Sequence, residues 1–149
     1  KIADCPRVLC AAPGYLEKHG TPQTPDELLT GEHNCLLLRY PHSPEYFWVL
    51  ETKEGPRKLQ VSGKFDADHS DVLTDWALSG YGIVNKPRFD VAEHLRKGDL
   101  VEILSDTPPP PTIFGCLYPH RRLQDPKIRH FVDFVIKHAD LSDRATAAE

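Results

Sequence analysis

Residue types that often carry catalysis are present in this sequence, but they are not spaced for it. Asp68-His69-Ser70 contains the side-chain types of a hydrolytic triad, yet consecutive residues cannot converge on one reacting atom. Residues 78–82 lack the first glycine of a nucleophile elbow. The eight histidines are dispersed, and none pairs with cysteine or glutamate at the spacing of a zinc site. The sequence therefore predicts no catalytic residue, no metal and no cofactor.

One polar segment, residues 65–71, could instead bind a small molecule. Its sequence, Phe65-Asp66-Ala67-Asp68-His69-Ser70-Asp71, predicts a turn between a strand and a helix. Helix N-termini carry unpaired N–H groups, and ligands of open α/β sheets collect at strand ends. In the alternative interpretation, Asp68 or Ser70 simply caps the helix and Asp71 complements its dipole. The two interpretations are compatible.

The elements around this turn alternate between strands and helices. Apolar runs bounded by proline or glycine predict strands, and capping signals or helical spacing of apolar residues predict helices. The expected strands are residues 7–12, 34–39, 45–52, 58–65, 82–86, 100–104 and a buried strand at 112–118, with a hairpin turn at 53–56. The expected helices are residues 13–19, a segment from Thr24 to Gly31, 68–79, 89–97, and a last one capped by Asp125-Pro126. We also expect an extended connector at 108–111 and a frayed tail from residue 142.

Composition narrows the class of protein. Of 149 residues, 40% are hydrophobic, which is enough for a packed core. The net charge of −4 argues against non-specific binding to nucleic acid or to anionic membranes. No apolar run approaches the ~18 residues of a membrane helix. The chain contains no methionine, so we expect it to be part of a longer protein.

The four cysteines form no C-x-x-C pair. Cys10, Cys35 and Cys116 lie inside apolar runs, which predicts buried, reduced thiols and a cytoplasmic location. A small basic cluster, residues 119–122, is expected to be a solvated loop or, alternatively, an anion contact.

Several short motifs follow one another in an order typical of one protein family. They are Arg7-Val8-Leu9-Cys10-Ala11-Ala12-Pro13-Gly14-Tyr15-Leu16, His19-Gly20-Thr21-Pro22, Thr24-Pro25-Asp26-Glu27-Leu28, Cys35-Leu36-Leu37-Leu38-Arg39, Val61-Ser62-Gly63, Ala77-Leu78-Ser79-Gly80-Tyr81-Gly82-Ile83-Val84-Asn85-Lys86-Pro87, Gly98-Asp99-Leu100-Val101, Leu117-Tyr118-Pro119-His120-Arg121-Arg122, Pro126-Lys127-Ile128-Arg129 and Phe131-Val132-Asp133-Phe134. With these motifs, which cover about residues 2–139, the chain resembles the C-terminal part of the effector-binding regulatory domain of LysR-type transcriptional regulators.

The resemblance implies an α/β fold of two lobes, like the type 2 periplasmic binding proteins, with the first lobe incomplete in this chain. It implies that residues 8–86 form the second lobe, that residues 1–7 and 87–140 belong to the first, and that residues 141–149 form a flexible tail. A small-molecule effector would bind between the lobes, and we expect its site to include Asp66, Asp68, His69, Ser70, Asn85 and Lys86. DNA would be bound only through a helix-turn-helix domain absent from this sequence.

Two other classes share this architecture. A periplasmic solute-binding protein would tend to pair or lack its thiols, and an enzyme would need a placed acid or base. The thiol pattern and the family motifs disfavour both.

Two further expectations concern the effector and association. The carboxylates of Asp66, Asp68 and Asp71 would compete with an anion, and Tyr40, Tyr46, Phe47 and Trp48 could stack on a cation, which favours an effector with an amine group. Because part of the first lobe is missing, we expect residues 1–149 to self-associate as a dimer or tetramer, away from any membrane.

Overall fold

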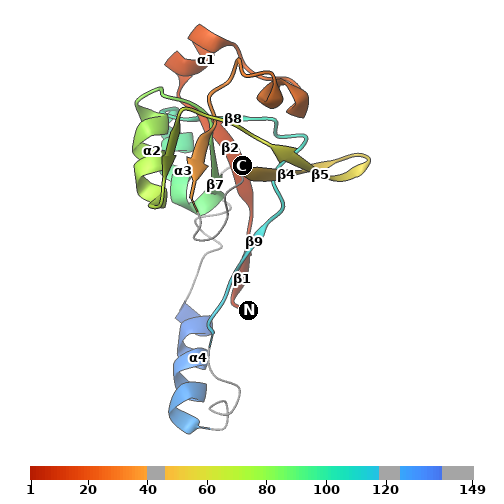
Figure 1. Cartoon of the computed structure of the whole chain (residues 1–149). Helices are drawn as coiled ribbons and strands as arrows, with labels where there is room; N and C mark the ends of the chain where they lie inside the picture. The colour runs from red at the N-terminus through yellow and green to blue at the C-terminus, as the bar shows by residue number, and fades with distance from the viewer. Residues whose placement is uncertain (40–45, 118–124, 139–149) are drawn as a thin grey trace.

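The computed structural model describes residues 1–39, 46–117 and 125–138 (Figure 1). Strands and helices alternate along the chain, which confirms the predicted α/β class. In chain order the elements are β1 (Ala3–Cys5), β2 (Arg7–Ala11), α1 (Pro13–His19), the 3-10 helix η1 (Pro25–Leu29), β3 (Leu36–Leu38), β4 (Phe47–Thr52), β5 (Gly55–Gln60), β6 (Phe65–Ala67), α2 (Ser70–Leu78), β7 (Val84–Pro87), α3 (Arg88–Lys97), β8 (Val101–Ile103), β9 (Thr112–Phe114) and α4 (Pro126–His138).

Local signals explain where several helices begin and end. The backbone N–H of Thr24 donates to Glu27 Oε1 at 3.0 Å, so the expected capping box forms at the start of η1. Helix α1 begins at Pro13 and stops before Gly20. Helix α3 ends at Gly98, whose φ of 79° lies in the left-handed region that glycine adopts without strain.

A three-stranded antiparallel sheet in the order β7–β2–β8 forms the centre of the molecule. Leu9 is paired with Asn85 on one side and with Ile103 on the other. Because side chains alternate along a strand, Arg7, Leu9 and Asn85 share one face, whereas Val8 and Lys86 share the opposite face. The first face packs toward the core that contains Trp48, and the second packs toward α2 and α3.

Beside this sheet, the parallel pair β3–β6 leads into α2. Two glycines let backbone segments approach Asn34 and Cys35 closely. A Cβ atom at Gly82 would lie 2.2 Å from the carbonyl oxygen of Asn34, and one at Gly63 would lie 1.8 Å from that of Cys35. Any side chain at either glycine would therefore push these backbones apart.

The expected hairpin is formed by β4 and β5, which pair from Phe47 opposite Gln60 to Thr52 opposite Gly55. Its turn is shorter than the expected residues 53–56. Only Lys53 and Glu54 separate the two strands, because β4 ends at Thr52 and β5 already begins at Gly55. The hairpin also contacts the proline-rich connector, since the N–H of Glu51 donates to the carbonyl of Pro108 at 2.8 Å.

A ribbon of two strands, β1 and β9, leaves the central sheet and leads toward α4, which stands apart from the rest of the molecule (Figure 1). Helix α4 begins at Pro126, as expected, but none of its residues is buried. The expectation of a buried strand at 112–118 is wrong, because β9 ends at Phe114 and Ile113 is 66% exposed. Its apolar sequence requires a cover that these described residues do not supply.

No break in packing coincides with residue 86 in the described part of the chain. Strand β8 lies in the same sheet as β2 and β7, and Val91 of α3 packs in the same core cluster as Val8 and Val84. Residues 6–39 and 46–111 thus form one packed body, from which the ribbon β1–β9 extends toward α4 (Figure 1).

Cys10 and Cys35 are buried and unpaired, as expected for reduced thiols, and Cys5 is buried and unpaired as well. Cys116 is only partly covered, so the expectation of burial is wrong there; it follows the exposed strand β9. No helix in the described ranges has the length and apolar character needed to cross a membrane. The basic cluster at 119–122, Tyr40 and the expected tail lie outside the described residues.

Candidate functional site

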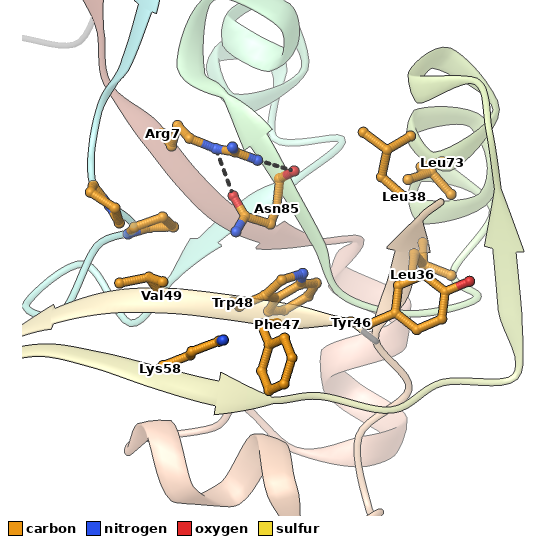
Figure 2. A pocket seen from close by; sticks show the side chains of 12 residues that line it. Arg7, Leu36, Leu38, Tyr46, Phe47, Trp48, Val49, Lys58, Leu73 and Asn85 are labelled. Carbon is orange, nitrogen blue, oxygen red and sulfur yellow. Dashed lines mark hydrogen bonds between the residues drawn. The ribbon is translucent and has the colours of Figure 1, made fainter. Parts of the chain in front are cut away.

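A cavity of about 380 Å³ lies where the hairpin, the central sheet and the proline connector meet (Figure 2). Arg7 is the first residue of β2 and lies two positions after the end of β1, and Pro109 and Pro110 precede β9, so the cavity lies at the base of the ribbon. Its lining residues are Arg7, Leu36, Leu38, Tyr46, Phe47, Trp48, Val49, Lys58, Leu73, Asn85, Pro109 and Pro110. Apolar walls with a few polar groups are typical of small-molecule sites.

Arg7 and Asn85 form the polar end of this cavity. Arg7 Nε donates to Asn85 Oδ1 at 3.0 Å, and its terminal nitrogen donates to the Asn85 carbonyl at 3.2 Å (Figure 2). Because the guanidinium is held at two points, it is presented in one orientation.

Aromatic side chains of the hairpin form the opposite wall. Trp48 is buried, whereas Tyr46 and Phe47 are partly exposed. Lys58 crosses from β5, with its Nζ 3.7 Å from the centre of the Phe47 ring. In the described part of the chain, the charged residues that line the cavity, Arg7 and Lys58, are therefore both basic.

Asp66 is the middle residue of the short strand β6, and its carboxylate is already engaged by protein groups. Arg39 forms an ion pair with one carboxylate oxygen, and the Tyr46 hydroxyl donates to the other at 2.5 Å. The Arg39 hydrogen bond and then the Tyr46 hydrogen bond lower the pKa of Asp66 below its ordinary value. Asp66 is therefore not the free carboxylate on which the expected cationic effector partly depended.

The helix that follows is capped by a residue other than the two considered from the sequence. The Nδ1 atom of His69 accepts a hydrogen bond from the Asp71 N–H at 3.3 Å, so His69 rather than Asp68 or Ser70 is the N-cap of α2. Histidine offers a ring nitrogen to the same unpaired N–H groups that a carboxylate would satisfy. Asp68 and His69 are exposed.

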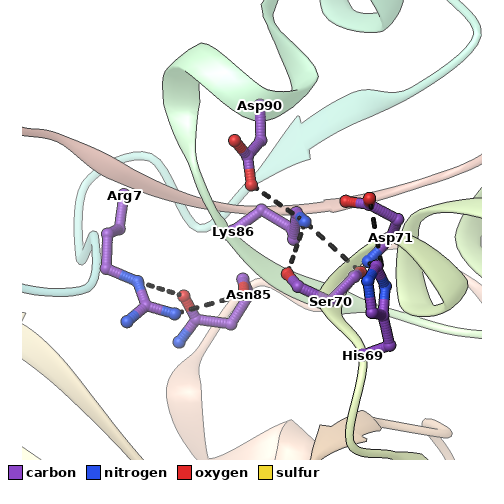
Figure 3. Close-up of polar contacts among 7 residues, drawn as sticks. All are labelled: Arg7, His69, Ser70, Asp71, Asn85, Lys86 and Asp90. Atoms are coloured by element: carbon purple, nitrogen blue, oxygen red, sulfur yellow. Dashed lines mark hydrogen bonds and ion pairs between the residues drawn. The ribbon is translucent and has the colours of Figure 1, made fainter.

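Lys86 lies on the face of β7 opposite Asn85, so the two neighbours do not enter the same space. Its Nζ donates to Ser70 Oγ at 2.6 Å and to the Ser70 carbonyl at 3.3 Å, and it pairs with Asp90 at 3.0 Å (Figure 3).

Of the six residues expected from the sequence, Asn85 thus lines the cavity, whereas Ser70 and Lys86 form a separate polar group that does not line it. Asp66 does not line the cavity, but it accepts a hydrogen bond from Tyr46, which does. Asp68 and His69 face solvent. Sequence analysis missed Arg7 and Lys58. Arg7 is brought to Asn85 by the pairing of β2 with β7, which the sequence of either strand alone does not reveal.

Within the residues that the structure describes, no group of three or more His, Cys, Asp or Glu side chains is arranged to hold a metal ion. Two larger hollows, of about 740 and 490 Å³, lie at the ends of α1 to α3 and beside the hairpin turn. Neither contains a cluster of aromatic walls and paired polar groups like the cavity at the base of the ribbon.

Comparisons with known proteins place the chain in a family. The family model described as the LysR substrate binding domain matches residues 1–140. The transcriptional regulator DmlR of Escherichia coli (strain K12) is 31% identical over 135 residues, which cover 91% of this chain and 43% of DmlR. CrgA of Neisseria meningitidis serogroup B is 34% identical over 128 residues, which cover 85% of this chain and 42% of CrgA. The chain therefore spans less than half the length of these relatives.

Comparison with solved structures indicates the same family. The full-length Vibrio cholerae virulence activator AphB superimposes with a TM-score of 0.75 at 34% identity, covering 92% of this chain and 46% of AphB. The regulatory domain of Neisseria meningitidis CrgA gives a TM-score of 0.68 at 30% identity, covering 91% of this chain and 65% of that domain. Such regulatory domains have the type 2 periplasmic-binding-protein-like fold. The predicted fold and family are therefore confirmed, and the chain belongs to the LysR-type transcriptional regulators as a LysR substrate binding domain.

Proposed function

We propose that this chain senses a small-molecule effector for a DNA-binding transcription factor of the cytoplasm, and that the effector binds in the cavity at the base of the ribbon. The observation that carries the proposal is the position of this cavity, where apolar walls, the held guanidinium of Arg7 and Asn85 meet at the base of the ribbon. The family consists of DNA-binding regulators, not of enzymes. DNA contact is assigned to a helix-turn-helix domain elsewhere in the longer protein.

In this proposal the two lobes divide at β1 and β9, and not at residue 86. What supports this boundary is the packing of α3 and β8 with the central sheet. An effector that binds one arrangement of the lobes better than another shifts their equilibrium by its differential affinity. In a self-associated regulator, such a shift changes the spacing of the DNA-binding domains.

We further propose that the effector carries an anionic or hydrogen-bond-accepting group beside an apolar portion. Arg7 and Lys58 line the cavity, and Asp66 is neutralised by Arg39. This replaces the amine-bearing effector expected from the sequence. Ser70 and Lys86 stay in the proposed site, whereas Asp68 and His69, which face solvent, would reach the effector only after a rearrangement.

The test is a thermal-shift screen of small carboxylates and amines against the complete regulatory domain. A ligand present at 100 times its dissociation constant should stabilise the domain by about 2.7 kcal/mol. Arg7→Met should abolish the response to anionic hits, because it removes the fixed guanidinium.

Arg57→Met is the matched control. Arg57 also pairs with a carboxylate, that of Asp26, but it does so outside the cavity. A hit whose affinity is unchanged by Arg7→Met and reduced by Arg57→Met would contradict the proposed site.

A further inference from the structure

One edge of strand β4 faces the proline-rich connector. Strand β4 pairs with β5 along its other edge, and in an antiparallel pair every second residue turns its N–H and C=O groups away from the partner strand. Glu51 is such a residue. Pro56 lies opposite it and has no N–H, and the N–H of Glu51 donates outside the hairpin, to the carbonyl of Pro108 at 2.8 Å.

The same alternation fixes the orientation of the residues that precede Glu51. The N–H of Val61, which follows β5, donates to the carbonyl of Tyr46 at 3.1 Å, so the even-numbered positions of this strand pair inward. The main-chain groups of Phe47 and Val49 therefore point away from β5, toward the same edge as the N–H of Glu51.

This edge borders the proposed effector cavity. Phe47 and Val49 line the cavity together with Pro109 and Pro110, which follow the hydrogen-bonded Pro108 along the connector (Figure 2). Proline has no N–H, so residues 108–111 offer carbonyl acceptors but no donor to the carbonyls of β4. Within the described ranges, no other main-chain group pairs with the N–H or the C=O of Val49.

An open strand edge beside a cavity selects a particular kind of ligand. Its N–H and C=O groups offer a donor and an acceptor side by side, and an extended peptide pairs with both as an added strand. A carboxylate satisfies the N–H but leaves the carbonyl without a donor, whereas an amide-linked amino acid satisfies both. The cavity of about 380 Å³ has the size of a small-molecule site.

The cavity also provides for a negative charge on such a ligand, because the basic side chains Arg7 and Lys58 line it. We infer that the effector is an amide-linked amino acid, either a short peptide or an N-acyl amino acid, whose amide pairs with the outer edge of β4 at Val49 and whose carboxylate lies near Arg7 and Lys58. This inference rests on the proposed function and narrows its anionic effector to one chemical class.

The experiment compares isosteric ligands by calorimetric titration of the full-length regulator. N-acetyl-L-phenylalanine represents the N-acyl amino acids, and L-alanyl-L-phenylalanine represents the peptides. In the ester of each, L-phenyllactate replaces L-phenylalanine, so an oxygen takes the place of the amide N–H. We expect at least one amide to bind, and its ester to bind about tenfold more weakly, because the carbonyl of Val49 then lacks its donor.

Val49→Pro removes the donor on the protein side. Because Val49 occupies an outward position, the substitution removes no hydrogen bond between β4 and β5. We expect it to weaken binding of the amide about tenfold. Gln60→Pro is the matched control. Gln60 lies opposite Phe47, so its N–H also points outward, but from the far edge of β5 and away from the cavity, and affinity should be unchanged.

Circular dichroism establishes that each variant is folded. If Val49→Pro is not, hydrogen exchange of residues 47–51 in the wild type takes its place, and it should slow when the amide binds. If Arg7→Met weakens a hit of the screen but neither amide binds, or each ester binds as tightly as its amide, the inference is overturned and the proposed function stands. If neither amide binds and Arg7→Met alters no hit, the proposed function fails and the inference fails with it.

Discussion

The carboxylate of Asp66 is held by Arg39 on one oxygen and by Tyr46 on the other. Both contacts favour the ionised form and lower its pKa in the folded protein. A carboxyl group whose folded pKa lies below its unfolded pKa stabilises the protein above the unfolded value, and this stabilisation disappears as the pH falls through the folded value.

We therefore expect the difference in Tm between the wild type and Asp66→Asn to be largest above about pH 5 and to shrink as the pH falls below 3.8, the ordinary value for this group. Thermal unfolding between pH 2.5 and pH 7 measures it. Tyr46→Phe, which removes the weaker contribution, should give an intermediate profile. A Tm difference that is constant with pH would show that the ion pair contributes nothing.

The cysteines differ in reactivity because their surroundings differ. Burial raises the pKa of Cys10 to about 12, with a further contribution from Glu102, and burial raises that of Cys35 to about 12. At pH 8 roughly one such thiol in ten thousand is ionised, and the thiolate is the reactive form. Cys116 is partly exposed.

A thiol reagent added to the native protein at pH 8 should thus modify Cys116 first and leave Cys10 and Cys35 unmodified until the chain unfolds. Mass spectrometry of tryptic peptides identifies the labelled residue. Cys116→Ser should remove the rapid phase, and rapid labelling of Cys35 in that variant would contradict the burial of β3.

At the scale of elements, the effect of replacing a glycine by alanine depends on how close another backbone segment lies. Where it lies close, the clash outweighs the entropy that alanine saves. A Cβ at Gly82 would meet the Asn34 carbonyl at 2.2 Å, whereas one at Gly14, inside α1, would meet nothing within 4 Å. Gly82→Ala should therefore destabilise the chain by about 2 kcal/mol or more, as overpacking of backbone against backbone does.

Gly14→Ala serves as the control and should be stabilising by about 0.5 kcal/mol, since alanine loses less entropy in a helix. Urea denaturation of both variants measures the free energies of unfolding. Equal effects of the two substitutions would mean that the segment 81–83 moves freely away from Asn34.

Most elements could be predicted from the sequence because their signals are local. The capping box at Thr24, the proline and glycine at the ends of α1, and the alternation in β5 depend on residues a few positions apart. The exposure of β9 could not be predicted in this way. An apolar strand shows that it needs a cover, but not whether the chain supplies one.

At the scale of the whole molecule, the candidate site also combines residues that local sequence patterns predict with residues that they do not. The turn at 65–71 and the strand with Asn85 were found because polar residues at a strand end are a local pattern. The pairing of Arg7 with Asn85 joins residues 78 positions apart, and the opposite orientations of Asn85 and Lys86 depend on strand register. Register is set by packing, which the sequence of one strand does not reveal.

The apolar side chains exposed on α4 affect how the molecule is expected to assemble. Phe131 and Phe134 are each 59% exposed and Ile136 is 51% exposed, while Ile113 of β9 is also largely uncovered. Each exposed aromatic residue can bury about 150–250 Å² in a contact, which favours covering these side chains with a second molecule.

We therefore expect residues 1–149 to self-associate through α4, so that the mean mass seen in sedimentation rises with protein concentration. Phe131→Ser/Phe134→Ser should shift the equilibrium toward the monomer by removing the largest apolar groups of the interface. Lys127→Ser/Lys137→Ser, on the same helix, changes two exposed charges and should leave association intact. A monomer at all concentrations, with cooperative unfolding independent of concentration, would instead show that α4 folds back and covers its own apolar face in solution.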